Sequence, residues 1–210
     1  QQYESAFEYI THLTDPELGE NRDVILFPEK LKINGKMRYV SIHRPVDPQL
    51  LPAINAPLPP CIAINAALEL EDLWCERKTE ALLANPRFCW ERDRIGASGP
   101  LHQLNENEWL MSYHGKQDDV HGYSQSFMIL ERRKNTFPAV KHRCPTRILF
   151  AEEDWEMPHR FKTPVIFTTG TEIIGDRLLA VYGAADERVG IAELDLPALL
   201  EYVRGFDADG

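Results

Sequence analysis

Short runs of β-branched and aromatic residues alternate with turn residues along most of the chain. In the first such region, residues 23–27 and 37–42 form two apolar runs with Asn34-Gly35 between them, and residues 37–42 alternate in polarity. Asn-Gly between two such runs is a strong β-hairpin signal. The pattern predicts two strands paired across this turn, and its recurrence predicts an all-β protein.

Two later regions repeat this order of strand, polar turn and strand. The second covers residues 100–130 around Asn105, and the third covers residues 165–192 around Gly175. The three turns begin at Asn34, Asn105 and Gly175, so the second follows 71 positions after the first and the third follows 70 positions after the second. This regular period predicts one repeated supersecondary unit. A β-sandwich whose hairpins are evenly spaced is the alternative.

One segment departs from the strand pattern. Asp195 is a suitable N-cap, Pro197 fits the first turn of a helix, and Gly205 follows Arg204 as a stop signal. These residues predict a short C-terminal helix that ends at Arg204. Because no linker or low-complexity tract divides the sequence, residues 1–210 are expected to form a single domain.

The composition is that of a globular protein, and its charge disfavours polyanionic partners. Hydrophobic residues make up 43% of the chain, and no apolar run reaches the roughly 20 residues of a membrane helix. Lys and Arg number 23 against 33 Asp and Glu, which gives a net charge of -10. We therefore expect neither nucleic acid nor a membrane surface as a partner. An anionic ligand would need cations gathered at one place.

The cysteines and the first residues point to a reducing compartment. Cys61, Cys75, Cys89 and Cys144 form no Cys-x-x-Cys pair and have no His at metal-ligand spacing, so we expect free thiols and no metal site. Residues 1–4 do not begin a basic and then apolar leader, which leads us to expect a cytoplasmic protein. The chain starts without Met, so it need not be the whole translation product.

Common enzyme motifs are missing from the sequence, and polar residues at strand ends remain as candidates. There is no Gly-x-Ser-x-Gly, phosphate-binding Gly-rich loop or His-Glu-x-x-His. Lys30 follows the first predicted strand, and His43 and Arg44 end its partner. Pairing across Asn34-Gly35 would bring these three together, where they would suit a phosphate. A solvated basic rim is the alternative.

The strand ends of the other two units carry aromatic residues beside polar ones. Tyr113 and His114 end one strand, and Tyr182 precedes Asp186 at the end of another. An aromatic ring beside a short polar side chain is common in sugar-binding sites. A structural Tyr and a buried, hydrogen-bonded His would produce the same pattern.

A set of motifs in fixed order resembles glycoside hydrolase family 130, the β-mannoside phosphorylases and their hydrolytic relatives. The motifs are residues 21–30, 34–36, 42–45, 90–91, 94–97, 109–115, 165–167, 182–186 and 189–192. The resemblance implies a five-bladed β-propeller with the active site in its central funnel. At about 70 residues a unit, this chain supplies about three blades, so we expect an open partial ring without the N-terminal blades.

The resemblance also implies an activity. In the phosphorylases of this family, inorganic phosphate attacks the anomeric carbon of a β-mannoside with inversion and releases α-mannose 1-phosphate. The expected substrates are manno-oligosaccharides or mannosyl-glucose, phosphate is the co-substrate, no cofactor is needed, and a homo-oligomer is possible. The alternatives are a β-mannosidase, in which Glu29 or another Glu activates water, and an inactive sugar-binding fragment.

The family motifs assign roles to single residues. The resemblance places Lys30, His43 and Arg44 at the phosphate and Asp186 on the mannosyl ring. It places Tyr123 and Phe167 at the neighbouring acceptor subsite, and Tyr113 and His114 in the funnel wall. The general acid is an Asp that lies upstream in the family, so we identify no catalytic acid in this chain. Asp15 and Asp23 are nearby carboxylates without the sequence context of that acid.

Overall fold

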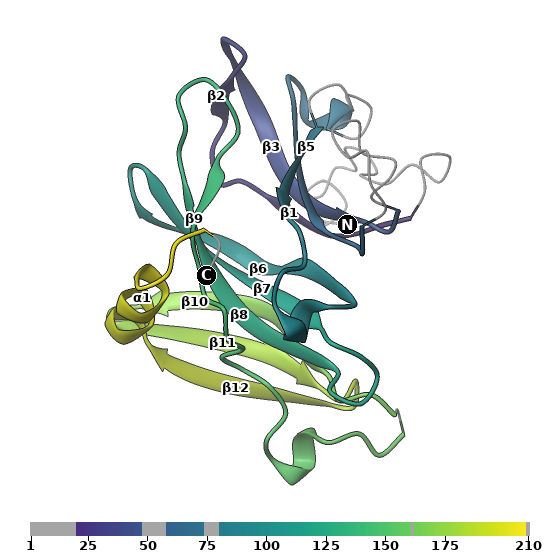
Figure 1. Ribbon diagram of the computed structural model, residues 1–210. Helices are drawn as coiled ribbons and strands as arrows, with labels where there is room; N and C mark the ends of the chain where they lie inside the picture. The colour runs from purple at the N-terminus through teal and green to yellow at the C-terminus, as the bar shows by residue number, and fades with distance from the viewer. Residues whose placement is uncertain (1–19, 48–57, 74–79, 161, 209–210) are drawn as a thin grey trace, which may run out of the picture.

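The computed structural model describes residues 20–47, 58–73, 80–160 and 162–208, which form three antiparallel sheets and one α-helix (Figure 1). The first sheet has the order β1-β3-β4-β5, with β2 paired to β3 beside this path. Its strands are β1 (Asn21–Leu26), β2 (Leu31–Ile33), β3 (Lys36–Pro45), β4 (Ile62–Ala67) and β5 (Glu80–Ala84). Strand alternation and turn signals thus produce the predicted all-β protein.

The second and third sheets are simple meanders, as their sequence pattern predicts. The second sheet contains β6 (Arg94–Asn105), β7 (Glu108–Lys116), β8 (Tyr123–Glu131) and β9 (Ala139–Arg143). The third contains β10 (Ile166–Ile174), β11 (Arg177–Ala184) and β12 (Arg188–Asp195). Gly175 forms the turn between β10 and β11 with a φ of 59°, a conformation that glycine adopts without strain.

The first hairpin differs from the one predicted. The Asn34-Gly35 turn joins the short β2 to β3, with Leu31 opposite Arg38. β1 also pairs with β3, but farther along, with Arg22 opposite Arg44. The sequence signal identified the turn and the pairing of β1 with β3 correctly, and it missed β2, because three residues are too few to stand out as a separate run.

The second sheet is the middle layer of the fold (Figure 1). Trp109 and Met111 of β7 belong to the core shared with the first sheet, where the Trp109 ring meets Phe27 edge-on at 5.3 Å between centroids. Leu110 faces the other way, into a core with Leu178 of the third sheet. Successive side chains on a strand point to opposite faces, and both faces of β7 are covered, so β7 is buried along almost its whole length.

The C-terminal helix forms as predicted and covers the edge of the second core. α1 (Leu196–Arg204) starts at Asp195, whose side chain accepts a hydrogen bond from the Ala198 amide at 2.8 Å. Gly205 is its C-cap residue. Two buried side chains, Leu199 and Val203, anchor the helix on the second core, and its polar face stays in solvent.

Two short 3₁₀ turns use a buried glutamate in the same way. In η5 (Cys89–Glu91), the Glu91 carboxylate accepts the backbone amides of residues 87 and 88 and the Tyr113 hydroxyl, the last at 2.8 Å. In η6 (Asp154–Glu156), Glu156 accepts the amides of residues 152 and 153 and the Tyr182 hydroxyl at 2.7 Å. Each glutamate fixes the loop that leads into a new sheet, since a buried carboxylate needs such donors.

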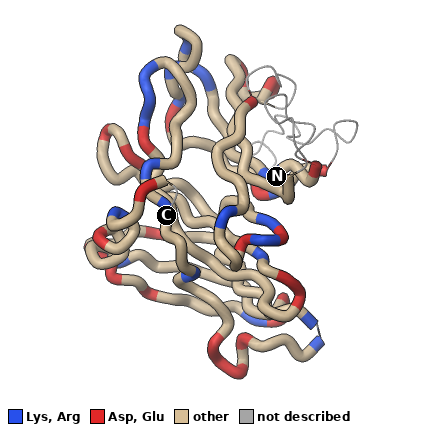
Figure 2. Tube along the Cα trace, viewed as in Figure 1, with Lys and Arg blue, Asp and Glu red and all other residues tan. Residues whose placement is uncertain are grey.

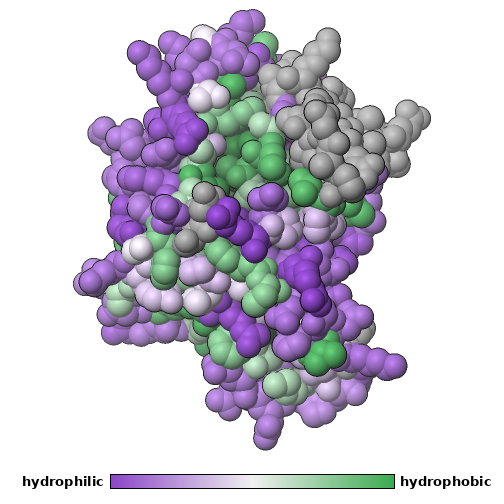
Figure 3. Space-filling view, viewed as in Figure 1, coloured by the Kyte–Doolittle hydropathy of each residue, from purple (hydrophilic) through white to green (hydrophobic). Residues whose placement is uncertain are grey.

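The three sheets stand as separate antiparallel units, and none of them closes on itself. Charged residues lie mainly along turns and strand ends (Figure 2), and apolar surface gathers on one face between the first and second sheets (Figure 3). Across the described residues, no helix is long and apolar enough to span a membrane. The three described cysteines, Cys61, Cys89 and Cys144, are free thiols, and Cys75 lies outside the described residues.

Candidate functional site

A cavity of about 260 Å³ lies where all three sheets meet. The first sheet supplies both arginines and Asp23, the second sheet supplies Tyr123 at the start of β8, and the third sheet with its adjoining segments supplies the other lining residues. The lining residues are Arg22, Asp23, Arg44, Tyr123, Val165, Phe167 and Asp186. Its size and its mixture of arginines, rings and carboxylates suit a small polar ligand.

The first strands of the three sheets, β1, β6 and β10, lie next to one another at this cavity. β6 lies beside both β1 and β10. Tyr123, at the start of β8, forms a bridge with Val165, and its amide donates to the Pro164 carbonyl at 3.0 Å. The site is therefore built on sheet backbone, which holds side chains more precisely than a loop does.

Asp23 and Arg44 form the polar centre of the cavity. Arg44 Nε donates to Asp23 Oδ2 at 2.5 Å, and both side chains are largely buried. Burial raises the pKa of Asp23, although the Arg44 guanidinium pulls that pKa down. Asp23 sits at an irregularity in the pairing of β1 with β3 and has a φ of 57°. A left-handed non-glycine residue of this kind is a frequent mark of a functional position.

His114 lies beneath the cavity wall rather than on it. Its ring is fully buried and packs against Phe167 at 4.6 Å and against Tyr123 at 5.9 Å between centroids. Burial, followed by the nearby arginines Arg44 and Arg94, lowers the pKa of His114 to about 3. The imidazole is therefore neutral at ordinary pH, and its Nδ1 lies 3.0 Å from Ser98 Oγ.

Asp186 reaches the cavity from the turn between β11 and β12. Ala185 and Asp186 both have left-handed backbone, with φ of 56° and 54°. The turn is held by the Ala185 amide, which donates to the Val165 carbonyl at 2.8 Å. Left-handed backbone is unfavourable for Ala, so the surrounding contacts must impose this conformation on Ala185. The result is an exposed carboxylate at the cavity rim.

The structure brings together four of the eight predicted site residues and sets a fifth directly beneath them. Arg44, Tyr123, Phe167 and Asp186 line the cavity, and His114 supports its rings. The remaining three, Lys30, His43 and Tyr113, lie elsewhere.

The structure places Lys30, His43 and Arg44 apart from one another. Lys30 Nζ lies 3.9 Å from the centre of the Tyr39 ring. Tyr39 precedes Arg44 by five residues on β3, so the two residues are roughly 16 Å apart along the strand. His43 neighbours Arg44 and so points to the opposite face of β3, where Nδ1 meets Asn21 Oδ1 at 3.2 Å and Nε2 meets Glu80 Oε1 at 3.0 Å. Lys30 directly precedes β2, which places it beside Tyr39, and strand alternation turns His43 away from Arg44.

Tyr113 also differs from its prediction as a funnel residue. It follows the same alternation and points away from His114, into the core between the first and second sheets. Its hydroxyl donates to Glu91, and Glu91 accepts from Arg143 Nη2 at 2.8 Å. Burial, and then the Glu91 charge, raise the pKa of Tyr113 well above its usual value. Tyr113 is part of the core.

Sequence reasoning missed Arg22 and Val165 and left Asp23 without a role. Asp23 carried one usable signal, since Asp tolerates the left-handed backbone of a bulge better than most residues. Arg22 and Val165 reach the site through strand pairing and packing, which no local pattern encodes.

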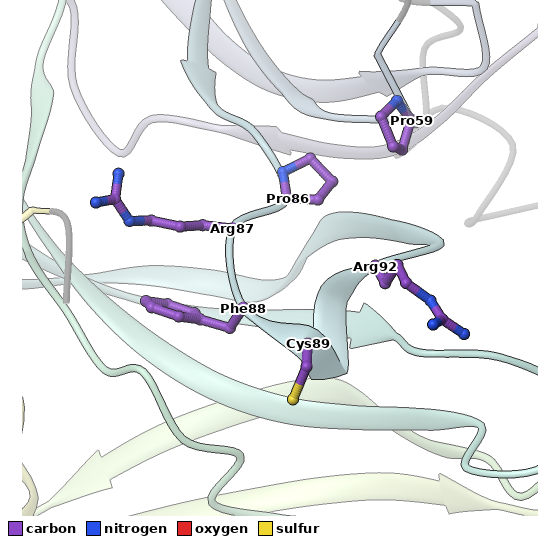
Figure 4. Close-up of a pocket in the computed structure, with 6 residues that line it drawn as sticks. All are labelled: Pro59, Pro86, Arg87, Phe88, Cys89 and Arg92. Atoms are coloured by element: carbon purple, nitrogen blue, oxygen red, sulfur yellow. The ribbon is translucent and has the colours of Figure 1, made fainter.

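A larger cavity of about 430 Å³ lies beside η5 (Figure 4). Its described lining comprises Pro59, Pro86, Arg87, Phe88, Cys89 and Arg92. Arg87 and Phe88 extend to one side of it, and Arg92 points to the other (Figure 4). These side chains do not converge on a common point. The smaller cavity, where polar groups converge, is the better candidate.

The arrangement at the smaller cavity suits an anion next to a sugar. Arg44 offers a planar guanidinium group that can bind a phosphate in two-point fashion, and Arg22, whose Nε and Nη2 donate to Glu20, adds positive charge beside it. Tyr123 and Phe167 offer rings for the apolar face of a pyranose, and Asp186 can accept hydroxyl hydrogen bonds. The cavity is lined by two carboxylates, Asp23, which is bonded to Arg44, and Asp186 at the rim.

The sequence matches one family model over residues 5–205, described as beta-1,4-mannooligosaccharide phosphorylase, Glyco_hydro_130. A beta-1,4-mannooligosaccharide phosphorylase from Ruminococcus albus is 30% identical over 186 residues, which cover 88% of this chain and 51% of the relative. A 1,2-beta-oligomannan phosphorylase from a Thermoanaerobacter species is 30% identical over 176 residues, which cover 84% of this chain and 51% of the relative. The chain therefore spans about half the length of these curated relatives.

A solved structure has a similar fold. The beta-1,2-mannobiose phosphorylase from Listeria innocua, in complex with beta-1,2-mannobiose, superimposes with a TM-score of 0.68 at 27% identity. The match covers 89% of this chain and 47% of that one. The three open sheets thus correspond to about half of a longer fold.

Proposed function

The chain belongs to glycoside hydrolase family 130, and on that premise we propose that it forms the phosphate- and sugar-binding half of an inverting β-mannoside phosphorylase. The observation that carries the proposal is the cavity in which two arginines face two aromatic rings and a carboxylate. We further propose that the three sheets are blades of a β-propeller whose funnel contains this cavity. The names of the relatives support a β-mannoside substrate.

Phosphorolysis with inversion makes modest demands on the protein. Phosphate is itself the nucleophile, so one carboxylic acid that protonates the leaving oxygen is enough, whereas an inverting hydrolase needs a second carboxylate to activate water. In our proposal Arg22 and Arg44 hold the phosphate below the anomeric carbon. Tyr123 and Phe167 flank the sugar, and Asp186 accepts hydrogen bonds from its hydroxyl groups. These roles are consistent with the charge of each cavity wall.

The leaving-group acid is proposed to lie in the half of the relatives' length that this chain does not span. The cavity carboxylates are poor candidates for the role. The Asp23 carboxylate is committed to its buried contact with Arg44. Asp186 is exposed at the rim, on the wall where it is proposed to bind sugar hydroxyls. Lys30 and His43, which the resemblance assigns to phosphate, lie outside the cavity, so the anion site proposed here rests on the two arginines.

The test is product analysis with the full-length protein. It is incubated with β-1,4-mannobiose or β-1,2-mannobiose, with and without inorganic phosphate, and the products are followed by ¹H and ³¹P NMR. We expect α-mannose 1-phosphate, formed only when phosphate is present. Release of free mannose without phosphate would instead identify a β-mannosidase. Sugar binding without turnover would identify a non-catalytic protein.

A further inference from the structure

Asp23 occupies a position that the fold builds around its carboxylate. The pairing of β1 with β3 is regular at Arg22 and shifts before Ile25, and Asp23 lies in that shift with left-handed backbone. The irregularity turns the side chain inward, so that it lines the cavity instead of continuing the strand alternation. This conformation would be unfavourable for most residues and is tolerated by Asp, Asn and Gly.

The neighbouring strand leaves space for that carboxylate. Gly96 of β6 is the residue next to it, and a methyl group at Gly96 would overlap both Asp23 Oδ2 and the His114 ring. His114 Nε2 lies 3.5 Å from the same oxygen, is buried, and has no hydrogen-bond partner. A glycine on one strand and a neutral imidazole on another therefore enclose Asp23 Oδ2 and direct it at Arg44.

The contact with Arg44 has a specific geometry. Asp23 takes the Nε hydrogen of the guanidinium. Among the described residues, no hydrogen bond uses the two terminal nitrogens of Arg44, and this side chain lines the cavity. An arginine held at Nε keeps its Nη edge available for two parallel bonds to one phosphate. Building on the proposed function, we propose that Asp23 is a positioning residue, which orients Arg44 for two-point binding of the phosphate co-substrate.

Orientation and charge predict opposite effects of altering Asp23. The carboxylate lies near the proposed anion, so its charge alone would weaken phosphate binding. Its hydrogen bond restrains a long side chain that would otherwise lose rotamer freedom on binding, which favours phosphate binding. If orientation dominates, removal of the side chain weakens binding, and the uncharged amide, which still accepts from Nε, preserves it.

The experiment compares Asp23→Gly with Asp23→Asn in the full-length protein, since both residues tolerate the left-handed backbone. Glu193→Ala is the matched control, because it removes the exposed carboxylate that pairs with Arg177 at 3.1 Å in the third sheet. Inorganic phosphate binding is measured by calorimetry, and retention of fold is checked by near-UV circular dichroism. We expect Asp23→Gly to raise the phosphate Kd about tenfold or more. Asp23→Asn should stay within about threefold of the parent, and Glu193→Ala should be unchanged.

Three results would overturn the role of Asp23: an unchanged Kd in Asp23→Gly, tighter phosphate binding in both variants, or a parent that binds no phosphate. Mannose 1-phosphate formation is measured separately. No turnover together with the expected binding pattern would refute the proposed function and keep the role of Asp23. Turnover with an unchanged phosphate KM in Asp23→Gly would refute the role of Asp23 and keep the function.

Discussion

Replacement of Glu91 by Ala should be among the most destabilising single changes in the second sheet. The carboxylate is fully buried and accepts four hydrogen bonds: two from backbone amides, one from the Tyr113 hydroxyl and one from Arg143. Arg143 is itself 3% exposed, so its charge would remain in the core without its carboxylate partner. Breaking a buried pair from one side costs about 3–5 kcal/mol.

Glu156→Ala provides the internal comparison. Glu156 has the same two backbone donors and the same tyrosine contact, but no arginine contacts it among the described residues. The loss is then that of hydrogen bonds from uncharged donors to a carboxylate, about 1–3 kcal/mol, without a charge left unpaired. The difference between the two variants isolates the cost of the unpaired charge. Replacing Glu91 and Arg143 together by Met should cost less than replacing Glu91 alone, because no charge is left buried.

The assay is urea unfolding followed by tryptophan fluorescence, with the unfolding free energy obtained by linear extrapolation. Trp90 packs on Tyr113 at 5.4 Å between ring centroids, so the signal reports on the region that is altered. A loss below about 1 kcal/mol in Glu91→Ala, or equal losses in Glu91→Ala and Glu156→Ala, would refute the reasoning.

Three further predictions follow from the placement of single side chains. Tyr113→Phe should lower the unfolding free energy by about 1–2 kcal/mol and leave the calorimetric phosphate Kd unchanged, because the Tyr113 hydroxyl donates to Glu91. A higher phosphate Kd would show that Tyr113 belongs to the binding site. Lys30→Ala should leave the phosphate KM within about twofold, since Lys30 packs on Tyr39, and a tenfold rise would show that this lysine reaches the anion. Arg204, followed by Lys141, lowers the pKa of Glu108 from 4.5 to about 2, so its stabilising contribution is complete above about pH 4.5 and is lost as the pH falls towards 2. Glu108→Gln should therefore remove about 1–3 kcal/mol of stability at pH 7 and flatten the urea-midpoint profile between those pH values; an unchanged profile would contradict the assignment.

Much of the fold could be predicted from the sequence because its signals are local. The turn at Asn34-Gly35, the regular spacing of the three units and the cap at Asp195 all depend on residues close together in the chain. The pairing of β1 with β3 was predicted, and the additional strand β2 was missed because it has three residues, too few for an alternation pattern. Strand pairing is a long-range choice that local pattern does not determine.

The candidate site was predictable only in part, for a related reason. Phe167 and Asp186 stand at strand ends of one repeat, where motif and structure agree. Lys30 lies beside Tyr39 because the unpredicted β2 starts directly after it, and the orientation of Tyr113 depends on which sheet covers each side of β7. Asp23 required knowledge of a pairing irregularity, which belongs to two strands at once.

The opposite orientations of Tyr113 and His114 bear on how this protein can change over evolutionary time. One of these adjacent residues holds the core through Glu91, and the other supports the rings of the cavity. A single-residue insertion or deletion within β7 would exchange their faces, placing a phenol beneath the cavity and an imidazole against Glu91. The segment between β7 and β8, residues 117–122, lies outside both strands and can absorb a length change at small cost. Length variation among descendants of this sequence should therefore collect in that loop, while β7 keeps its length.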